Sequence, residues 1–387
     1  MRSLNSISES NNDQLIEKIL NIILQFEQVN ISIKNIIINL RFLNNLLTIF
    51  NHDLIKFESK LKILRFINSI SSNSKFIDQL NKLNCLGILI DETKNLMNDS
   101  SIINGNNFNL ENVNDYRLIK SSSFILPILF NLCYLNNENQ INLINYEFIP
   151  YLIELNSISK LEIINNEIIK ILCEIINNYN INNNLNYFNN EFNKLNLILF
   201  YFDLFNNYKW QINCIDSIIK LIKYDETKEN NSSKQIALRY LLKDNNQENN
   251  NNNEKDNIKQ IIYKSIIISK NLDQFLEKLI ELIDIFKNDD IKFRIFNNRK
   301  LIEYLINKFN LNKINNNNNN NIQENVLILK FFKSLIGLKE TRSTKSYSKL
   351  IKELYKIKID YDNDKSNLSN KSVVIDQLLI EMLLSKD

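Results

Sequence analysis

Apolar residues recur at spacings of three and four along most of the chain, which is the period of an amphipathic helix. The clearest stretch runs from Leu129 to Leu155, and its apolar positions are Leu129, Phe130, Leu132, Cys133, Ile141, Ile144, Phe148, Ile149, Leu152 and Ile153. The pattern predicts two short helices joined by polar, asparagine-rich turns. Because neither helix can bury its apolar side alone, the unit needs neighbours of the same kind, as in an α-solenoid.

A short motif of two apolar residues, two variable residues and Leu-Ile repeats near residues 85–90, 148–153 and 301–306. Gly87 in the first copy occupies the place of Pro150 in the second. A unit of two or three helices over ~40–47 residues is typical of armadillo and HEAT repeats. Strands are disfavoured, because the Gly and Pro turns that punctuate a sheet are almost absent. The sequence therefore predicts an all-α fold, an α-solenoid of irregular armadillo/HEAT-like repeats.

The same period places helices along the rest of the chain, at residues 13–26, 31–49, 60–70, 76–83, 85–96, 158–179 (one long helix or two short ones), 195–205, 210–224, 276–286, 322–336, 347–359 and 372–384. Asp289 and Asp290 mark a further helix start. We expect a disordered N-terminus at residues 1–12 and a single solenoid domain over residues 13–387. Low-complexity loops are expected near residues 98–114, 181–190, 244–256 and 315–321.

Composition adds little to this picture of function. The chain has 387 residues, 3 Gly, 2 Pro and one alanine, Ala237, while asparagine fills roughly a fifth of all positions. We interpret the asparagine content as codon bias in an AT-rich genome, so it is a poor guide to function. The net charge of +3 does not predict nucleic-acid binding for the whole chain. Without a signal peptide or a membrane-length apolar run, we expect a soluble, cytoplasmic protein.

Metal, cofactor and catalytic sites have no support in the residue pattern. The four cysteines, Cys85, Cys133, Cys173 and Cys214, each lie in an apolar helical context without a Cys-X-X-Cys pair, which favours reduced, buried thiols in a cytosolic or nuclear protein. His52 is the only histidine, in a turn. A zinc site or a catalytic triad would need a cluster that is missing here. We therefore expect no catalytic residue, metal or cofactor.

Three segments, in order, resemble one kinase family. They read ILFNLCYLNNENQINLINYEFIPYLIEL (128–155), LILFYFDLFNNYKWQINCIDSIIKLIKYDETK (197–228) and LEKLIELIDIFKNDDIKFRIFNNRKLIEYLINKF (276–309), followed by a closing VVIDQLLIEMLL. They are similar to the armadillo-like C-terminal region of the septation-initiation and mitotic-exit serine/threonine kinases, the relatives of MAP-kinase-kinase-kinase-epsilon. In the second segment the family pattern is kept at Trp210, Asp216, Ser217 and Ile218 and is altered at Cys214 and Ile215.

The sequence lacks the motifs of a kinase domain: the Gly-rich loop, the Val-Ala-Ile-Lys strand, the His-Arg-Asp loop and Asp-Phe-Gly. The resemblance therefore implies a non-catalytic scaffold that localises or restrains such a kinase. Implied partners are kinase-pathway or spindle-pole proteins or a second copy of the chain, and implied locations are the spindle pole body or the division site. Met1 is a natural start, or a kinase domain lies upstream. The alternative function is a free-standing adaptor of the importin-α type, against which the single Trp counts.

Two groups of residues are candidates for partner binding. In the first, Trp210 and the neighbouring Tyr208 are either an exposed anchor for a partner peptide or, for Trp210, a packing residue between repeats. The second is a basic segment whose candidate residues are Lys339, Arg342, Lys345, Lys349, Lys352 and Lys356. It is either a face for an acidic partner, an anionic membrane surface or RNA, or a solvated helix face. Phosphorylation would cancel its charge at the hydroxyl side chains Thr341, Ser343, Thr344 and Ser346.

Overall fold

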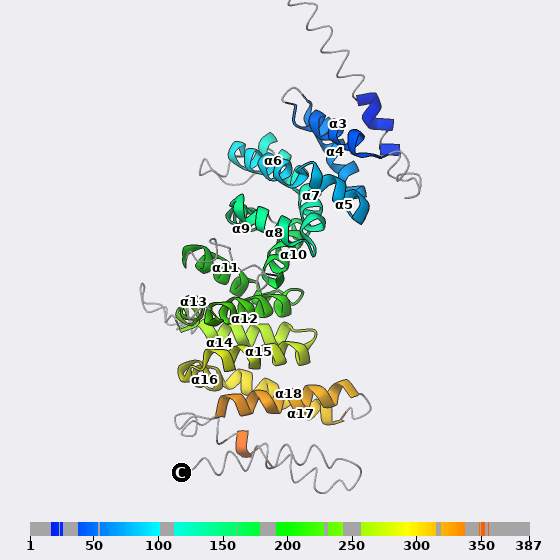
Figure 1. Ribbon diagram of the computed structural model, residues 1–387. Coiled ribbons are helices and arrows are strands. Elements are labelled where there is room, and N and C mark those ends of the chain that lie inside the picture. Colours follow the sequence, from blue (N-terminus) through cyan, green and yellow to red (C-terminus); the bar gives the residue numbers. More distant parts are fainter. Residues whose placement is uncertain are drawn as a thin grey trace, which may run out of the picture. The chain divides into compact units, whose positions relative to one another are not determined.

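The computed structural model describes residues 17–22, 24–25, 38–52, 55–100, 112–159, 161–178, 191–227, 231–242, 257–314, 319–336, 348, 350–352 and 355. Every regular element in these ranges is a helix and none is a strand, which confirms the predicted all-α class (Figure 1). The chain divides into two compact units, Met1–Asn189 and Asn190–Asp387. The division falls at the asparagine-rich stretch near residues 181–190, and the single domain stays a prediction.

In the first unit, every third helix stacks on the one before it, from α4 onward. Its helices are α3 (Leu40–Phe50), α4 (Phe57–Ile70), α5 (Ser74–Lys82), α6 (Cys85–Asp99), α7 (Val113–Cys133), α8 (Asn137–Asn145), α9 (Ile149–Ile158) and α10 (Glu162–Asn178). α4 packs along α7, and α7 packs along α10 (Figure 1). The intervening helices connect consecutive members of this stack, and two of them, α6 and α8, also pack against α7.

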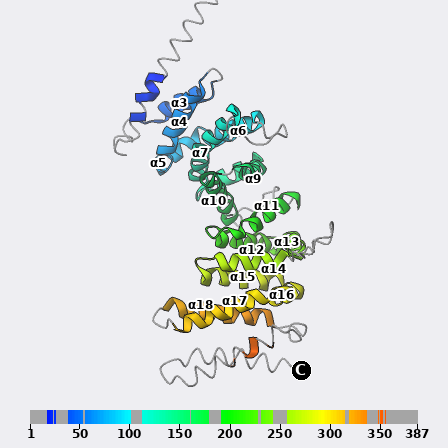
Figure 2. The same cartoon turned by 180° about the vertical axis from the view of Figure 1, so that it is seen from behind.

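The second unit repeats the arrangement. Its elements are α11 (Glu191–Asp203), the 3₁₀ turn η4 (Leu204–Asn206), α12 (Gln211–Thr227), α13 (Ser232–Leu242), α14 (Asn257–Ile268), α15 (Leu272–Phe286), α16 (Asp289–Phe296), α17 (Arg299–Ile314) and α18 (Asn319–Ile336). α12 packs along α15, and α15 packs along α18, as the view from behind also shows (Figure 2). Each unit is thus a short solenoid whose repeat contains three helices, as in armadillo proteins.

The repeated motif lies at packing positions in all three copies. Its buried members are Cys85, Leu86, Leu89, Ile90, Phe148, Ile149, Leu152, Leu301, Ile302, Leu305 and Ile306. Asn84 and Glu147, which directly precede the first two copies, share a left-handed backbone with φ of 52°. A Cβ at Gly87 would lie 2.7 Å from the Asn84 amide nitrogen and 2.8 Å from the Tyr146 hydroxyl. Glycine therefore permits a close approach at the start of α6.

Asparagine has a structural use at the helix starts. In the described part of the chain, asparagine side chains directly before a helix accept a hydrogen bond from a backbone N–H in its first turn, at Asn39, Asn73, Asn112, Asn136, Asn288 and Asn298. Such a cap stabilises a helix by ~1 kcal/mol. Whatever its genomic origin, part of the asparagine content is thus used where a short polar side chain satisfies free donors.

Several predicted boundaries were wrong. Residues 31–37 of the helix predicted over residues 31–49 lie outside the described residues, and the described helix begins only at Leu40, because Asn39 is extended and its side chain accepts from the Phe42 N–H at 2.9 Å. The stretch from Leu129 to Leu155 contains parts of three helices rather than two, namely α7, α8 and α9. Pro150 lies in the first turn of α9, where its missing N–H costs no hydrogen bond.

Agreement with the predicted helices is mixed from α10 onward. Residues 162–178 form one helix, α10, and α16 begins at Asp289 as predicted. α13 was not predicted, and α18 begins at Asn319, within the loop expected at residues 315–321. The terminal segments 1–12 and 372–384 and the loop at 244–256 lie outside the described residues. Among the residues that are described, no helix is long and apolar enough to cross a membrane.

Candidate functional site

One side of α12 carries a polar stripe at helical spacing. The exposed or half-exposed residues are Asn213, Asp216, Lys220, Lys223 and Glu226, while Ile215, Ile218, Ile219 and Ile222 are buried on the other side. α15 has the same division: Glu277, Lys278, Glu281 and Asp284 line its outer side, and Phe275, Leu276, Leu279 and Leu282 are buried. This apolar period fixes the rotation of both helices, so their charged sides lie together.

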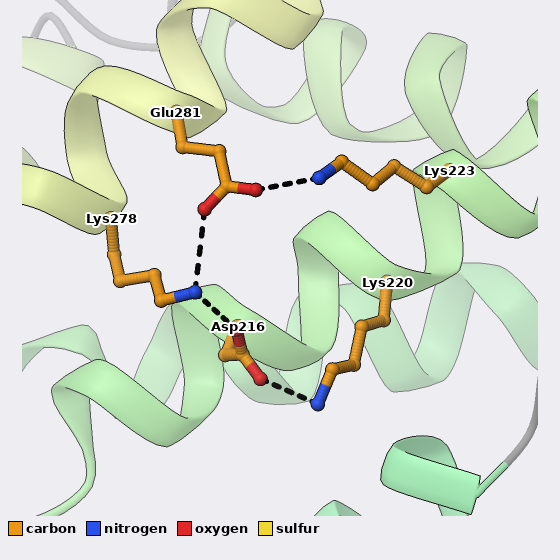
Figure 3. Close-up of polar contacts among 5 residues, drawn as sticks. All are labelled: Asp216, Lys220, Lys223, Lys278 and Glu281. Carbon is orange, nitrogen blue, oxygen red and sulfur yellow. Dashed lines mark hydrogen bonds and ion pairs between the residues drawn. The ribbon is translucent and has the colours of Figure 1, made fainter.

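A chain of five charges joins α12 to α15 along this side (Figure 3). Asp216 accepts from Lys220 on its own helix and from Lys278 on α15, each at 2.7 Å. Glu281 accepts from Lys223 on α12 at 2.6 Å and from Lys278 at 3.3 Å. We call these five residues the surface network. Lysine and carboxylate alternate along it, so every carboxylate has two cationic partners.

The surface network shifts the acidities of its members. Burial alone would raise the pKa of Asp216, but the hydrogen bonds and positive charges of Lys220 and Lys278 outweigh it and hold this pKa below its ordinary value. The hydrogen bond with Asp216 raises the pKa of Lys278. The hydrogen bond from Lys223, aided by Lys278, lowers the pKa of Glu281. The shifts of these three pKa values all favour the charged forms of Asp216, Glu281 and Lys278.

An open hollow of about 530 Å³ lies beside the surface network, between the end of α12 and the outer side of α15. Its wall contains the carboxylates of Glu226, Glu277, Glu281 and Asp284. Two lysines, Lys223 and Lys287, and two isoleucines, Ile280 and Ile285, complete the lining. The hollow thus combines a surplus of negative charge with an apolar portion.

A second ionic group on α12 faces the interior, and we call it the buried cluster. Lys194 of α11 donates to Asp225 at 2.7 Å and to the Ser232 hydroxyl at 2.8 Å. Asp225 also accepts from the Ser233 N–H at 2.8 Å, at the start of α13. The Lys194 and Asp225 side chains are only 2% and 3% exposed. The buried cluster therefore ties α11, α12 and α13 together.

The partner-binding residues predicted from the sequence are only partly described. Tyr208 is exposed in the turn before α12, and the Lys270 ammonium lies 3.9 Å from the centre of its ring. Trp210 is half-buried in the same turn, so both of its interpretations stay open. Lys352 is exposed. The remaining predicted residues lie outside the described part of the chain: Lys339, Arg342, Lys345, Lys349, Lys356, Thr341, Ser343, Thr344 and Ser346.

The surface network was missed at the sequence level, although one signal for it was present. In the sequence, Asp216 stands out only as a residue that the resembled family keeps. Charges at spacings of three and four on the predicted helices at 210–224 and 276–286 indicate polar sides. They do not indicate that Asp216 and Lys278, far apart in the sequence, form an ion pair.

The cysteine thiols are buried, and two of them have raised pKa values. Burial raises the pKa of the Cys85 thiol to about 12. Burial also raises the pKa of the Cys133 thiol, and the nearby negative charge of Glu174 raises that pKa further. A protonated thiol is a poor nucleophile and a poor metal ligand. Over the described ranges, no three His, Cys, Asp or Glu residues are grouped so that they could hold a metal ion.

Comparison with protein-family models gives no match for this chain, and comparison with curated proteins gives none either. Among solved structures, the chain is similar to the structure of the TSC2 N-terminus, with a TM-score of 0.39 and 10% sequence identity. That alignment covers 97% of this chain and 96% of the other. A similarity at this level supports no inference about function.

Proposed function

We propose that the chain is a non-catalytic protein-binding scaffold and that the charged outer side of α12 and α15 is its recognition surface. The observation that carries the proposal is the surface network together with the adjoining hollow, on two helices that stack at the repeat step. Solenoids present such rows of equivalent helices as extended binding surfaces. A partner gains specificity from a fixed pattern of charges more than from their raw attraction.

The test compares proteins captured by tagged full-length chain with those captured by the double variant Lys220→Ser and Lys223→Ser. Both lysines lie on the outer side of α12, so their replacement changes the surface and leaves the core intact. A matched control, Lys82→Ser with Lys120→Ser, removes the same charge from exposed sites in the first unit. We expect a directly binding protein whose captured amount the control leaves unchanged and the double variant changes, because the double variant alters the charge pattern beside the hollow.

The proposal fails if no captured protein binds the purified chain directly. The part that concerns α12 and α15 fails if both double variants retain the partner equally. Unfolding curves of the two variants serve as the check on folding, since exposed substitutions away from special features usually change stability by less than ~0.5 kcal/mol.

A finer proposal concerns the partner's identity. On the resemblance at residues 128–155, 197–228 and 276–309, we propose that the scaffold serves a septation-initiation or mitotic-exit kinase. A pathway kinase among the direct partners, and a fluorescent fusion at the spindle pole body or division site during division, would support it. A kinase-coding frame running into Met1 from upstream would place both parts in one protein. Direct partners unrelated to division would overturn the finer proposal and leave the scaffold proposal standing.

A further inference from the structure

The outer side of α15 carries two carboxylates that the surface network does not use. Glu277 and Asp284 are exposed, and neither forms a hydrogen bond or an ion pair with any part of the chain that the structure describes. The other two carboxylates of the hollow are paired: Glu281 with Lys223 and Lys278, and Glu226 with Lys234 at 3.6 Å. The negative charge left for a partner is therefore at Glu277 and Asp284, and Lys287 beyond the end of α15 offsets one of these two charges.

An apolar portion lies between these two charges. Ile280 follows Glu277 by about one turn and precedes Asp284 by about one turn, so all three line the same side of α15. Ile285 adds a second half-exposed apolar side chain to the hollow. Carboxylates at both ends and isoleucine between them form a pattern that is complementary to basic, apolar and basic groups in series.

The spacing fits a short extended segment. Glu277 and Asp284 are two turns apart, which separates their backbone positions by ~10 Å at 1.5 Å per residue. An extended chain advances ~3.3 Å per residue, so basic residues two to four positions apart reach both carboxylates through their flexible side chains. A hollow of about 530 Å³ falls within the ~300–1,000 Å³ range of small-ligand pockets, which suits a few side chains and not a whole domain.

We propose that this hollow binds a short segment of a partner protein in which an apolar side chain lies between basic residues. The basic groups pair with Glu277 and Asp284, and the apolar side chain packs against Ile280 and Ile285. Lys223 and Glu281 pair with each other, so together they form a part of the wall that has no net charge. This inference rests on the proposed scaffold function and adds the chemistry of what the scaffold binds.

The probe is a fluorescein-labelled nine-residue peptide with a central leucine, two lysines on each side and Gly-Ser ends. Binding to the full chain is followed by fluorescence anisotropy. We expect the double variant Glu277→Gln and Asp284→Asn to bind about tenfold more weakly, since each exposed ion pair contributes modestly and the two add. The control Asp91→Asn with Glu154→Gln removes the same charge from exposed residues of the first unit and should bind as the wild type does.

A second peptide, with serine in place of leucine, tests the apolar contact. It should bind several-fold more weakly to the wild type, and Ile280→Asn should remove most of the difference between the two peptides. No binding of the leucine peptide by the wild type overturns the proposal, and so does equal weakening by the test and control variants. A charge effect without any effect of leucine or Ile280 overturns it as well.

Failure of this inference can be told apart from failure of the scaffold proposal. A captured partner whose binding changes in Lys220→Ser with Lys223→Ser and is unaltered in Glu277→Gln with Asp284→Asn overturns the hollow and supports the scaffold. Absence of any direct partner overturns the scaffold whatever the peptide does. If sedimentation shows dimers that the Glu277→Gln and Asp284→Asn variant cannot form, the occupant is a second copy and the proposed partner segment is wrong.

Discussion

Two ionic groups share α12 and differ in almost every physical respect. Asp225 faces inward, where it meets Lys194, and both side chains are almost fully buried. Asp216 faces outward, where it meets Lys220 and Lys278 at a similar distance of 2.7 Å, with side chains that are 24–31% exposed. Geometry alone does not distinguish the two groups. Their energies differ because a buried charge that loses its partner has no water to replace it, whereas a surface charge does.

The comparison teaches that the two groups serve different ends. Desolvation makes the buried cluster sensitive to the loss of either partner, so it holds α11, α12 and α13 in one arrangement. The surface network contributes little to stability and keeps its charges available at the surface. We therefore assign structure to the buried cluster and recognition to the surface network.

The largest expected effect comes from Asp225→Asn. Asparagine still accepts the Ser233 N–H, but it leaves the Lys194 ammonium buried without a counter-charge. We expect a loss of ~3–5 kcal/mol in the free energy of unfolding, measured by chemical denaturation. A loss below ~1 kcal/mol, the range of an exposed pair, would break the comparison.

A double variant guards against the case in which Asp225→Asn does not fold. Lys194→Met with Asp225→Asn removes both charges and keeps a side chain of similar length in the α11 site. Since no buried charge remains unpaired, we expect the double variant to be more stable than Asp225→Asn alone. A double variant that is less stable than the single one would show that the charge pair is not the source of the effect.

An intermediate effect is expected from the surface network, and it depends on pH. The pKa values of Asp216 and Glu281 lie below their ordinary values of 3.8 and 4.5, so their stabilisation is present above those values and is lost as pH falls through the lowered pKa values. The pKa of Lys278 is raised, so its contribution to stability is present below the ordinary value of 10.5 and is lost as the pH rises through the raised pKa.

The test compares the wild type with Asp216→Asn plus Glu281→Gln by denaturation at several pH values. We expect the wild type to be more stable by about 1 kcal/mol near neutral pH, with a difference that shrinks toward acid. A difference that grows as the pH falls would contradict the signs of the pKa shifts.

The smallest expected effect comes from Lys223→Ala. The side chain is 52% exposed, so its pair with Glu281 is well solvated although the distance is 2.6 Å. We expect a change in the free energy of unfolding within ~0.5 kcal/mol. The partner capture described above should nevertheless respond, because Lys223 belongs to the proposed recognition surface. A large loss of stability would show that Lys223 supports the fold, and it would contradict the assignment of the surface network to recognition.

Much of the fold could be predicted from the apolar period. Nearly all the fixed apolar positions of the motif copies at 85–90, 148–153 and 301–306 are buried, because an apolar stripe on a short helix has to face a neighbour. Boundaries were less predictable, since an asparagine cap such as Asn39 looks like any other asparagine in a chain with so many. α13 was missed because it is short and follows a polar stretch, and its start depends on a tertiary contact with Asp225.

The candidate site was mostly beyond prediction. Lys194 and Lys220 look alike in the sequence, as do Asp225 and Asp216, and only the packing of α11, α12 and α15 decides which are buried. The residues singled out for partner binding were chosen by type, as an unusual Trp or a run of lysines. The face that the structure presents is instead built from ordinary charged residues brought together by repeat stacking.

Amide hydrogen exchange of the full chain, with and without a directly binding captured partner, tests the central claim most directly. We predict that the partner slows exchange chiefly in peptides from residues 211–227 and 272–286, which contain the surface network and the hollow. Peptides from α11 and α13 around the buried cluster should change little, since that cluster is already closed to solvent. Slowed exchange elsewhere, with none over α12 and α15, would contradict the assignment of recognition to this surface.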